Sequence, residues 1–268
     1  GRRGRAGAPR ARRAALSALT VELCRVGATT VALLTQIVGL WVDVLLYRRA
    51  AFATLRNTYA MLARYKEDVR PIVRTIPGPV VSELLGLAAL APLLDTSLRA
   101  PVCPEVKVSD ASPYGGASVQ VSIGRAAAAE LWRHRVRPGN VDDRINARGV
   151  RRSDDAVGEL LEGCPAKPVL AFQFPAGRGP HINIGESRAR RALWRHLAAD
   201  PAEHGKRHLV AYDSAVTVGA SVKGRSPSGC LMRELQITAA HILAIDCQEG
   251  ALWCASESNL ADSGSRQG

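Results

Sequence analysis

The sequence predicts an α/β protein, in which helices flank a mixed β-sheet and a helical segment precedes it. Two observations support this fold class. Residues 14–94 repeat apolar side chains with helical spacing, whereas five later stretches alternate apolar and polar residues or form short apolar runs between turns. Helical stretches lie between the last three of these strands along the chain, which is typical of helices layered on a mixed sheet.

Composition narrows the class of protein. The chain has 268 residues, of which 47% are hydrophobic, so a wholly disordered chain is excluded. Lys and Arg number 36 against 24 Asp and Glu, and the resulting net charge of +12 favours a polyanionic partner, either nucleic acid or an acidic membrane surface. Six cysteines without a CxxC pair indicate reduced thiols in an intracellular protein, cytoplasmic or nuclear and not secreted. The histidines have no zinc-ligand spacing.

The chain divides into three parts by composition. Residues 1–13 carry six arginines and no acid, so we expect a disordered basic arm that contacts phosphates. Residues 14–100 form a helical region, and residues 101–268 form the α/β domain with a charged insertion at about 125–165. Because the chain begins with Gly, we expect a fragment of a longer protein.

A membrane span is considered for one segment of the helical region. Residues 26–47 form an apolar run long enough to cross a bilayer. Asp43 lies within it, however, and arginines flank both of its ends, so no orientation signal results. Several apolar helices in succession favour a packed bundle, and membrane association is the weaker alternative.

The elements of the α/β domain follow from periodicity and turn residues. Expected strands cover residues 106–110, 118–123, 169–174, 207–212 and 251–254. Expected helices cover residues 183–198, 214–222 and 226–245. Ser226 is the expected N-cap of the last helix, with Pro227 at its first position.

Four carboxylates occupy positions that this pattern leaves unexplained. Asp110 and Asp213 each close a strand and share a face with apolar residues of that strand. Glu186 lies in line with the apolar stripe of its helix, at offsets of three, seven and eleven from Ala189, Leu193 and Leu197. Asp262 follows the last strand. Each also has a structural explanation: Asp110 as a turn residue, Asp213 as an N-cap, Glu186 as a capping-box acid for Asn183, and Asp262 as a loop acid.

Buried acids are costly unless they are paired or bind a cation. If the strands that end in Asp110 and Asp213 are neighbours, these carboxylates meet at one edge of the sheet and Glu186 reaches them from its helix. Three or four such acids repel one another without a cation, and their hard oxygen ligands suit Mg²⁺ or Mn²⁺. Two such ions activate water and stabilise the leaving oxygen of a phosphodiester.

Four segments in order resemble the ribonuclease H domain of reverse-transcribing retroelements, with the closest likeness to the DIRS type. They are LLDTSLRAPVCPEVKVSDASPYGGASV (93–119), PHINIGESRARRAL (180–193), VAYDSAVTVGASVKGRSPS (210–228) and ASESNLADSGSR (255–266). The resemblance covers roughly residues 93–266. The region 14–92 looks more weakly like the thumb or connection segment of a reverse transcriptase.

The resemblance implies the ribonuclease H-like fold, with a mixed five-stranded sheet and flanking helices, and endonucleolytic cleavage of the RNA strand of RNA–DNA hybrids. Carried over by position, Asp110, Glu186, Asp213 and Asp262 are the catalytic carboxylates and hold two Mg²⁺ or Mn²⁺ ions. His181 and Asn183 match the motif but are expected to set the start of the helix. Lys223 and Arg225 are the expected contacts to the nucleic-acid backbone, since a hybrid is read through its backbone shape and 2′-hydroxyls.

The sequence departs from the ribonuclease H pattern in three ways, and two other functions are alternatives to the nuclease. The insertion at 125–165 lies where a tight connection is usual, no histidine stands just before the last aspartate, and the chain has no YxDD motif of a polymerase. The first rival is a catalytically inactive relic that binds nucleic acid through its basic surface. The second is a basic membrane-associated protein.

Overall fold

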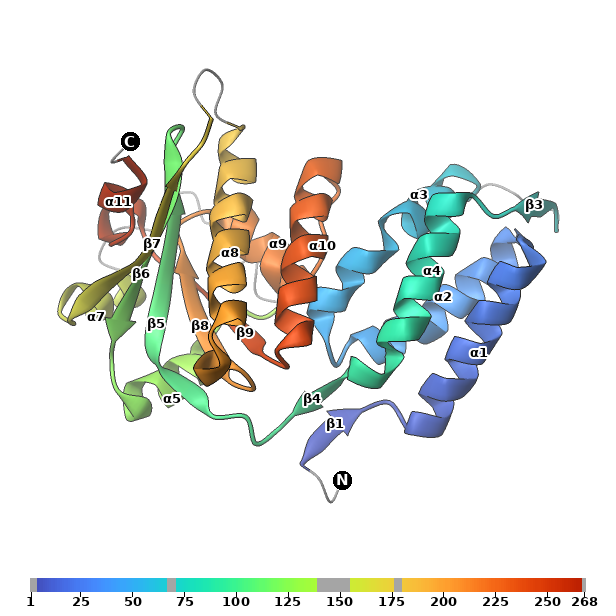
Figure 1. Ribbon diagram of the computed structural model, residues 1–268, viewed down its shortest axis with the longest axis horizontal. Coiled ribbons are helices and arrows are strands. Elements are labelled where there is room, and N and C mark those ends of the chain that lie inside the picture. The colour runs from blue at the N-terminus through green and yellow to red at the C-terminus, as the bar shows by residue number, and fades with distance from the viewer. Residues whose placement is uncertain (1–3, 67–70, 139–154, 176–179, 267–268) are drawn as a thin grey trace. The chain divides into compact units, whose positions relative to one another are not determined.

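The computed structural model describes residues 4–66, 71–138, 155–175 and 180–266. The chain divides into two compact units, unit 1 (residues 1–99) and unit 2 (residues 100–268) (Figure 1).

Unit 1 is mainly helical. Its elements are β1 (Arg5–Gly7), α1 (Arg10–Val26), β2 (Ala28–Thr30), α2 (Val31–Leu45), η1 (Arg49–Leu55), α3 (Arg56–Arg64), β3 (Val73–Thr75), α4 (Gly78–Leu90), η2 (Ala91–Leu93) and β4 (Asp95–Ser97). β1 pairs with β4 and β2 pairs with β3, each as a short antiparallel ribbon. Trp41 is fully buried, and its indole Nε1 donates a hydrogen bond of 2.9 Å to Thr20 Oγ1, which joins α2 to α1.

The long apolar run at residues 26–47 is not one helix. α1 ends at Val26 because Gly27 follows with a φ of 72°, a left-handed conformation that glycine adopts at low cost. β2 then separates α1 from α2, whose N-cap is Thr30. Within the described parts of the chain, every helix is too short or too polar to cross a bilayer.

The disorder expected for residues 1–13 does not hold for residues 4–13. Arg5 lies in β1, and its Nε is 2.5 Å from Asp95 Oδ1 on the partner strand. Arg13 is buried in α1, where its Nη1 donates to the carbonyl oxygen of Ala91 at 2.6 Å. These arginines are therefore part of the folded unit, because each finds an acceptor near β4.

Unit 2 is built on a five-stranded mixed sheet. Its strands are β5 (Val102–Ala111), β6 (Gly115–Ser122), β7 (Ala166–Gln173), β8 (Arg207–Tyr212) and β9 (Gln248–Trp253), in the order β7-β6-β5-β8-β9. β5, β6 and β7 pair antiparallel, whereas β5, β8 and β9 pair in parallel. The five strands expected from the sequence are all present, and β8 has the predicted bounds.

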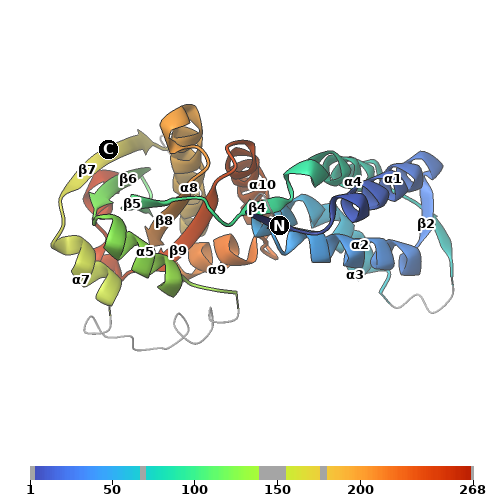
Figure 2. The ribbon, with the colours of Figure 1, turned by 90° about the horizontal axis from the view of Figure 1, so that it is seen from below.

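Helices cover both faces of this sheet. They are α5 (Arg125–His134), α7 (Ala156–Glu162), α8 (Ile182–Ala199), η4 (Pro201–Glu203), α9 (Ala215–Lys223), α10 (Gly229–Ala244), η5 (Ser256–Ser258) and α11 (Asp262–Arg266). α8 and α10 pack together on one face, and α5 lies on the other (Figure 2). On the α5 face, Val106, Val108 and Leu209 form a buried core with Ala128 and Leu161.

In unit 2, one helix begins later than expected, and the expected insertion contains two helices. The helix expected at 226–245 begins later, because Ser228 and not Ser226 is the N-cap of α10, accepting from the amide of Leu231 at 3.5 Å. The insertion at 125–165 contains α5 and α7, and residues 139–154 between them lie outside the described residues.

Candidate functional site

Three of the four predicted carboxylates come together at one edge of the sheet in unit 2. β5 and β8 are parallel neighbours, with Val108 opposite Ala211. The same register, continued by two residues, brings Asp110 opposite Asp213, which directly follows β8. Glu186 reaches the same edge from the second turn of α8. One carboxylate oxygen from each acid lies within 4.8 Å of one from each of the others.

Glu186 is a buried member of this group whose carboxyl has a strongly raised pKa. The apolar stripe of α8, on which the sequence places Glu186, is buried along its length, and Glu186 itself is only 4% exposed. Its Oε2 is buried without a hydrogen-bond partner. Burial, followed by the negative charges of Asp213 and Asp110, raises the pKa of Glu186 to about 9. Without a cation, this carboxyl is therefore protonated at neutral pH.

Asp110 is held in place by two side chains from the end of the chain. Asn259 Nδ2 donates to its Oδ1 at 3.2 Å, and Ser265 Oγ donates to its Oδ2 at 2.6 Å. Burial raises the pKa of Asp110, and the hydrogen bond from Ser265 opposes that shift. The carboxylate is thus fixed in orientation before any ligand arrives.

Asp213 offers a second unpartnered oxygen. Its Oδ1 is buried and has no hydrogen-bond partner, and Trp253 Nε1 donates to its backbone carbonyl at 3.1 Å, which fixes the chain there. The alternative role of Asp213 as an N-cap is wrong. Ser214 caps α9 instead, accepting from the amide of Thr217 at 3.2 Å.

The capping alternative for Glu186 is also wrong. His181 is the N-cap of α8, and its Nδ1 accepts from the amide of Asn183 at 3.3 Å. The expectation that the segment around His181 sets the start of the helix is confirmed. Asp110 likewise lies inside β5 and not in a turn.

Asp262 does not join the other three carboxylates. It is the first residue of α11, and Arg266 Nε lies 2.9 Å from its Oδ1. Its side chain is 40% exposed. Its negative charge nevertheless raises the pKa of Asp110, so it lies close enough to influence the cluster. The expected set of four acids is thus a group of three with an outlying fourth.

The two basic residues predicted to contact nucleic acid lie apart from the cluster along α9. Lys223 is the last residue of α9 and Arg225 follows it, and both are exposed. α9 begins two residues after Asp213, and its nine residues span roughly 13 Å along the helix axis. These cations therefore face solvent about one helix length from the carboxylates.

Sequence reasoning assigned no role to Asn259 or Ser265, which orient Asp110. Both stand in the closing segment ASESNLADSGSR, so the signal was present in that motif. Their contacts span 149 and 155 residues, and no local pattern identifies the partner of such a contact.

The cluster has the donor set of a site for a hard divalent cation. Three carboxylates converge, and two of their buried oxygens have no partner. Unpaired buried carboxylates repel one another, and a cation among them removes both the repulsion and the unmet hydrogen-bonding need.

Comparisons with family models, with curated proteins and with solved structures gave no match for this chain.

Proposed function

We propose that unit 2 is a metal-dependent nuclease of the ribonuclease H type, which cleaves the RNA strand of RNA–DNA hybrids. The convergence of Asp110, Glu186 and Asp213 is the observation that carries this proposal. The mixed five-stranded sheet with flanking helices supports it, since it is the architecture that the four sequence segments imply.

The three carboxylates fit Mg²⁺ or Mn²⁺ by donor chemistry. These hard cations take oxygen ligands, and Glu186 Oε2 and Asp213 Oδ1 are buried oxygens without a partner. When bound, a pair of such ions supplies an activated water and stabilises the leaving oxygen of a phosphodiester. The number of two ions is part of the proposal, because it follows from the resemblance to ribonuclease H domains.

The chain's own residues prepare the site for this chemistry. Asn259 and Ser265 hold Asp110 in one orientation, so little reorganisation is needed when a ligand binds. Glu186 carries a proton at neutral pH and releases it from its carboxyl as the positive charge arrives. Lys223 and Arg225 lie exposed and are the proposed contacts to the phosphate backbone.

One observation favours a second candidate, a nucleic-acid-binding protein without catalytic activity. Asp262, the expected fourth ligand, forms an ion pair with Arg266 and lies outside the group of three. A chain that has lost activity would still bind hybrids through its basic charge, with strong dependence on salt.

A cleavage assay decides between these functions. We expect the full chain to cut a labelled RNA–DNA hybrid in the presence of Mg²⁺, and to lose that activity when a chelator is added. Asp110→Asn and Asp213→Asn should each lower the rate by more than about a hundredfold, because even partners outside the ligand set cost 10–100-fold. Asp200→Asn is the matched control, because Asp200 is exposed and only caps η4.

Full activity in both variants would exclude these roles. Hybrid binding without cleavage in the unaltered chain would favour the inactive binding protein.

A further inference from the structure

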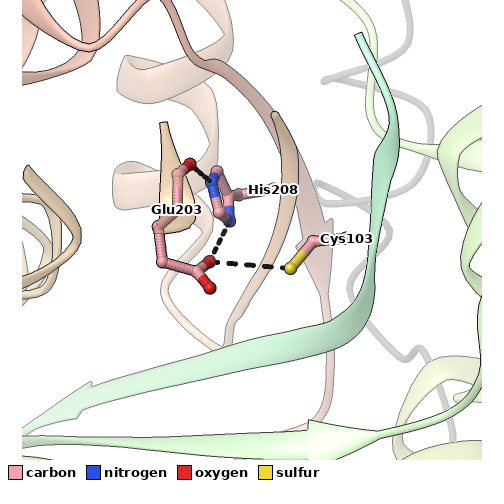
Figure 3. A group of neighbouring side chains, drawn as sticks. All are labelled: Cys103, Glu203 and His208. Carbon is pink, nitrogen blue, oxygen red and sulfur yellow. Dashed lines mark hydrogen bonds and ion pairs between the residues drawn. The ribbon is translucent and has the colours of Figure 1, made fainter. Parts of the chain in front are cut away.

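A second cluster of metal-binding side chains lies at the other end of the sheet. Cys103 stands at the start of β5, His208 at the start of β8, and Glu203 at the end of η4 between α8 and β8 (Figure 3). Asp110 lies seven positions after Cys103 along β5, roughly 23 Å in an extended strand. This cluster is therefore independent of the three carboxylates, and its argument does not rest on the proposed nuclease function.

The distances within the cluster match those of a tetrahedral site. Glu203 Oε2 is 3.6 Å from Cys103 Sγ and 3.5 Å from His208 Nδ1. One ligand atom from each residue lies within 4.8 Å of the others. In a tetrahedral zinc site, bond lengths of about 2.3 Å to sulfur and about 2.0 Å to nitrogen and oxygen place neighbouring ligand atoms roughly 3.3–3.5 Å apart. The two separations from Glu203 Oε2 are thus close to those between ligands of one zinc ion.

His208 presents an unpartnered nitrogen to this cluster. Its side chain is fully buried, and its Nε2 lies 3.0 Å from the backbone carbonyl of Glu203. A carbonyl only accepts hydrogen bonds, so Nε2 carries the hydrogen, and in the neutral ring Nδ1 keeps a lone pair. Nδ1 has no hydrogen-bond partner and faces the carboxylate of Glu203. His208 Nδ1 and Glu203 Oε2 are two acceptors that face each other, and a cation between them would satisfy both.

The arrangement of His208 is typical of a metal ligand. Histidines that bind metals usually donate their second ring nitrogen to a carbonyl or carboxylate, which fixes the tautomer and the orientation of the ring. The His208 ring also packs at right angles to the ring of Trp194 of α8, with centroids 5.6 Å apart. The imidazole is therefore held in one orientation.

From this geometry we infer that Cys103, Glu203 and His208 bind a transition-metal ion, with Zn²⁺ as the ion that the donors favour. A thiolate, an imidazole and a carboxylate are the usual protein ligands of zinc, whereas Mg²⁺ prefers oxygen alone. Three protein ligands leave the fourth position of a tetrahedron for water or a further side chain. The site joins the starts of two neighbouring strands to the turn after α8.

The surrounding charges are compatible with this ion. Lys206 Nζ lies 3.4 Å from Glu203 Oε1, which leaves Oε2 for the metal. Lys107 Nζ donates to Gln120 Oε1 at 2.7 Å and stays 4.0 Å from Glu203 Oε2. Glu105 Oε2 accepts from the thiol of Cys103 at 2.9 Å and passes the thiol proton to water when the thiolate forms, so Glu105 ends as a carboxylate. The carboxylates of Glu105 and Glu203 balance the two lysines, so replacement of the thiol proton by Zn²⁺ adds one positive charge.

The test uses Co²⁺ as a spectroscopic probe for the zinc site. The full chain is freed of metal with a chelator and titrated with Co²⁺, and the sulfur-to-cobalt charge-transfer absorption is recorded. We expect one equivalent of Co²⁺ to produce this absorption and one equivalent of Zn²⁺ to abolish it. Because the carboxylate cluster offers only oxygen, cobalt bound there produces no such band, so this result is separable from that of the nuclease assay.

Variants identify the ligands. Cys103→Ser should abolish the band, and His208→Gln and Glu203→Gln should each weaken Co²⁺ binding at least tenfold. Cys254→Ser is the matched control, because Cys254 is an equally buried free thiol that lies outside the cluster, and it should keep the band. Zn²⁺ should also raise the thermal unfolding midpoint of the unaltered chain and of the control by more than it raises that of Cys103→Ser, which keeps only the carboxylate cluster.

Two results would overturn the inference. One is the absence of a sulfur-to-cobalt band in the unaltered chain, which needs no variant to fold. The other is a His208 ring that carries hydrogens on both nitrogens at neutral pH and whose NMR signals do not shift when Zn²⁺ is added, because a proton would then occupy the place proposed for the metal.

Discussion

Glu186 shows how a single residue couples folding to function. Its neighbours on α8 require the stripe to be buried, and Glu186 is buried with them. Ionisation of this carboxyl in the folded protein is costly without a cation, because the group is buried and because Asp213 and Asp110 stand beside it. The site therefore favours a protonated Glu186 or a bound metal.

The pH dependence of stability should reveal this group. The folded pKa of Glu186 is about 9, above its ordinary value of 4.5. In the metal-free protein, its stabilising contribution is complete below the ordinary value and is lost as pH rises toward the folded pKa, by at most about 1.4 kcal/mol per pH unit. We expect Glu186→Gln to remove this loss. Urea unfolding of both proteins in chelator between about pH 5 and about pH 8 measures it.

The difference in unfolding free energy between Glu186→Gln and the unaltered chain should grow with pH. Added Mg²⁺ should reduce that difference at neutral pH by stabilising the unaltered chain. Parallel pH profiles for the two proteins would show that Glu186 has an ordinary pKa.

Residue-scale prediction from the sequence succeeded where a local period set the answer. The two-residue period of strands and the apolar stripe of a helix predicted the faces of Asp110 and Glu186. Asp262 was grouped with them, but its place depends on the start of α11 and on its pairing with Arg266. His208 was missed as a candidate ligand because its partners, Cys103 and Glu203, meet it only through the sheet and the turn after α8.

At the scale of elements, one buried network holds α8 against the sheet near the site. Arg190 of α8 forms a two-point ion pair with Glu249 of β9, with Nε 3.0 Å from Oε1. Tyr212, the last residue of β8, donates to the same Oε1 at 2.8 Å. Arg190 lies one turn after Glu186, and Tyr212 directly precedes Asp213, so this network fixes the two elements that carry these acids.

Loss of this network should weaken both the fold and the site. Glu249→Gln removes the charge that faces the buried Arg190, and loss of one partner of a buried ion pair costs about 3–5 kcal/mol. We expect the urea midpoint to fall accordingly, and hybrid cleavage to fall even under conditions where the variant remains folded. Glu257→Gln is the control, because Glu257 is exposed. A midpoint for Glu249→Gln that equals that of the control would show that the network contributes nothing.

Element bounds were predicted best where turn chemistry is unambiguous. β8 begins and ends as expected, between Gly205 and Ser214. The start of α10 was placed two residues early, because Ser226 and Ser228 are both good caps and only Ser228 accepts from the helix. In unit 1, Gly27 ends α1 inside an apolar run whose composition alone suggests continuity.

At the scale of the whole molecule, the net charge is the basis on which a polyanionic partner is proposed. The net charge of +12 is uneven along the chain, because residues 1–99 have 15 Lys and Arg against 6 Asp and Glu, whereas residues 100–268 have 21 against 18. The acidic cluster lies in unit 2, the less basic of the two. A basic surface attracts a polyanion by its charge, while a buried group of acids suits the cations that accompany phosphates. The α/β class and the order of strands along the chain followed from periodicity, whereas the lateral strand order needed the structure.

Binding of an RNA–DNA hybrid should depend steeply on salt. Release of counterions from the phosphates makes affinity fall as salt rises, by about a thousandfold between about 50 and 200 mM salt for six phosphate contacts. We expect a fall of at least about tenfold for the unaltered chain, and a smaller slope for the double variant Lys223→Gln and Arg225→Gln. Fluorescence anisotropy with a labelled hybrid measures both. An affinity that does not change with salt would exclude backbone recognition by the basic surface.

The most direct measurement of the central claim is an anomalous-difference map from crystals of the full chain that contain Mn²⁺. The account predicts a manganese peak bounded by the carboxylates of Asp110, Glu186 and Asp213, and its loss in Asp213→Asn crystals. Manganese bound elsewhere while these three carboxylates bind none would contradict the account, because the chain would then lack the metal centre on which the proposed nuclease depends.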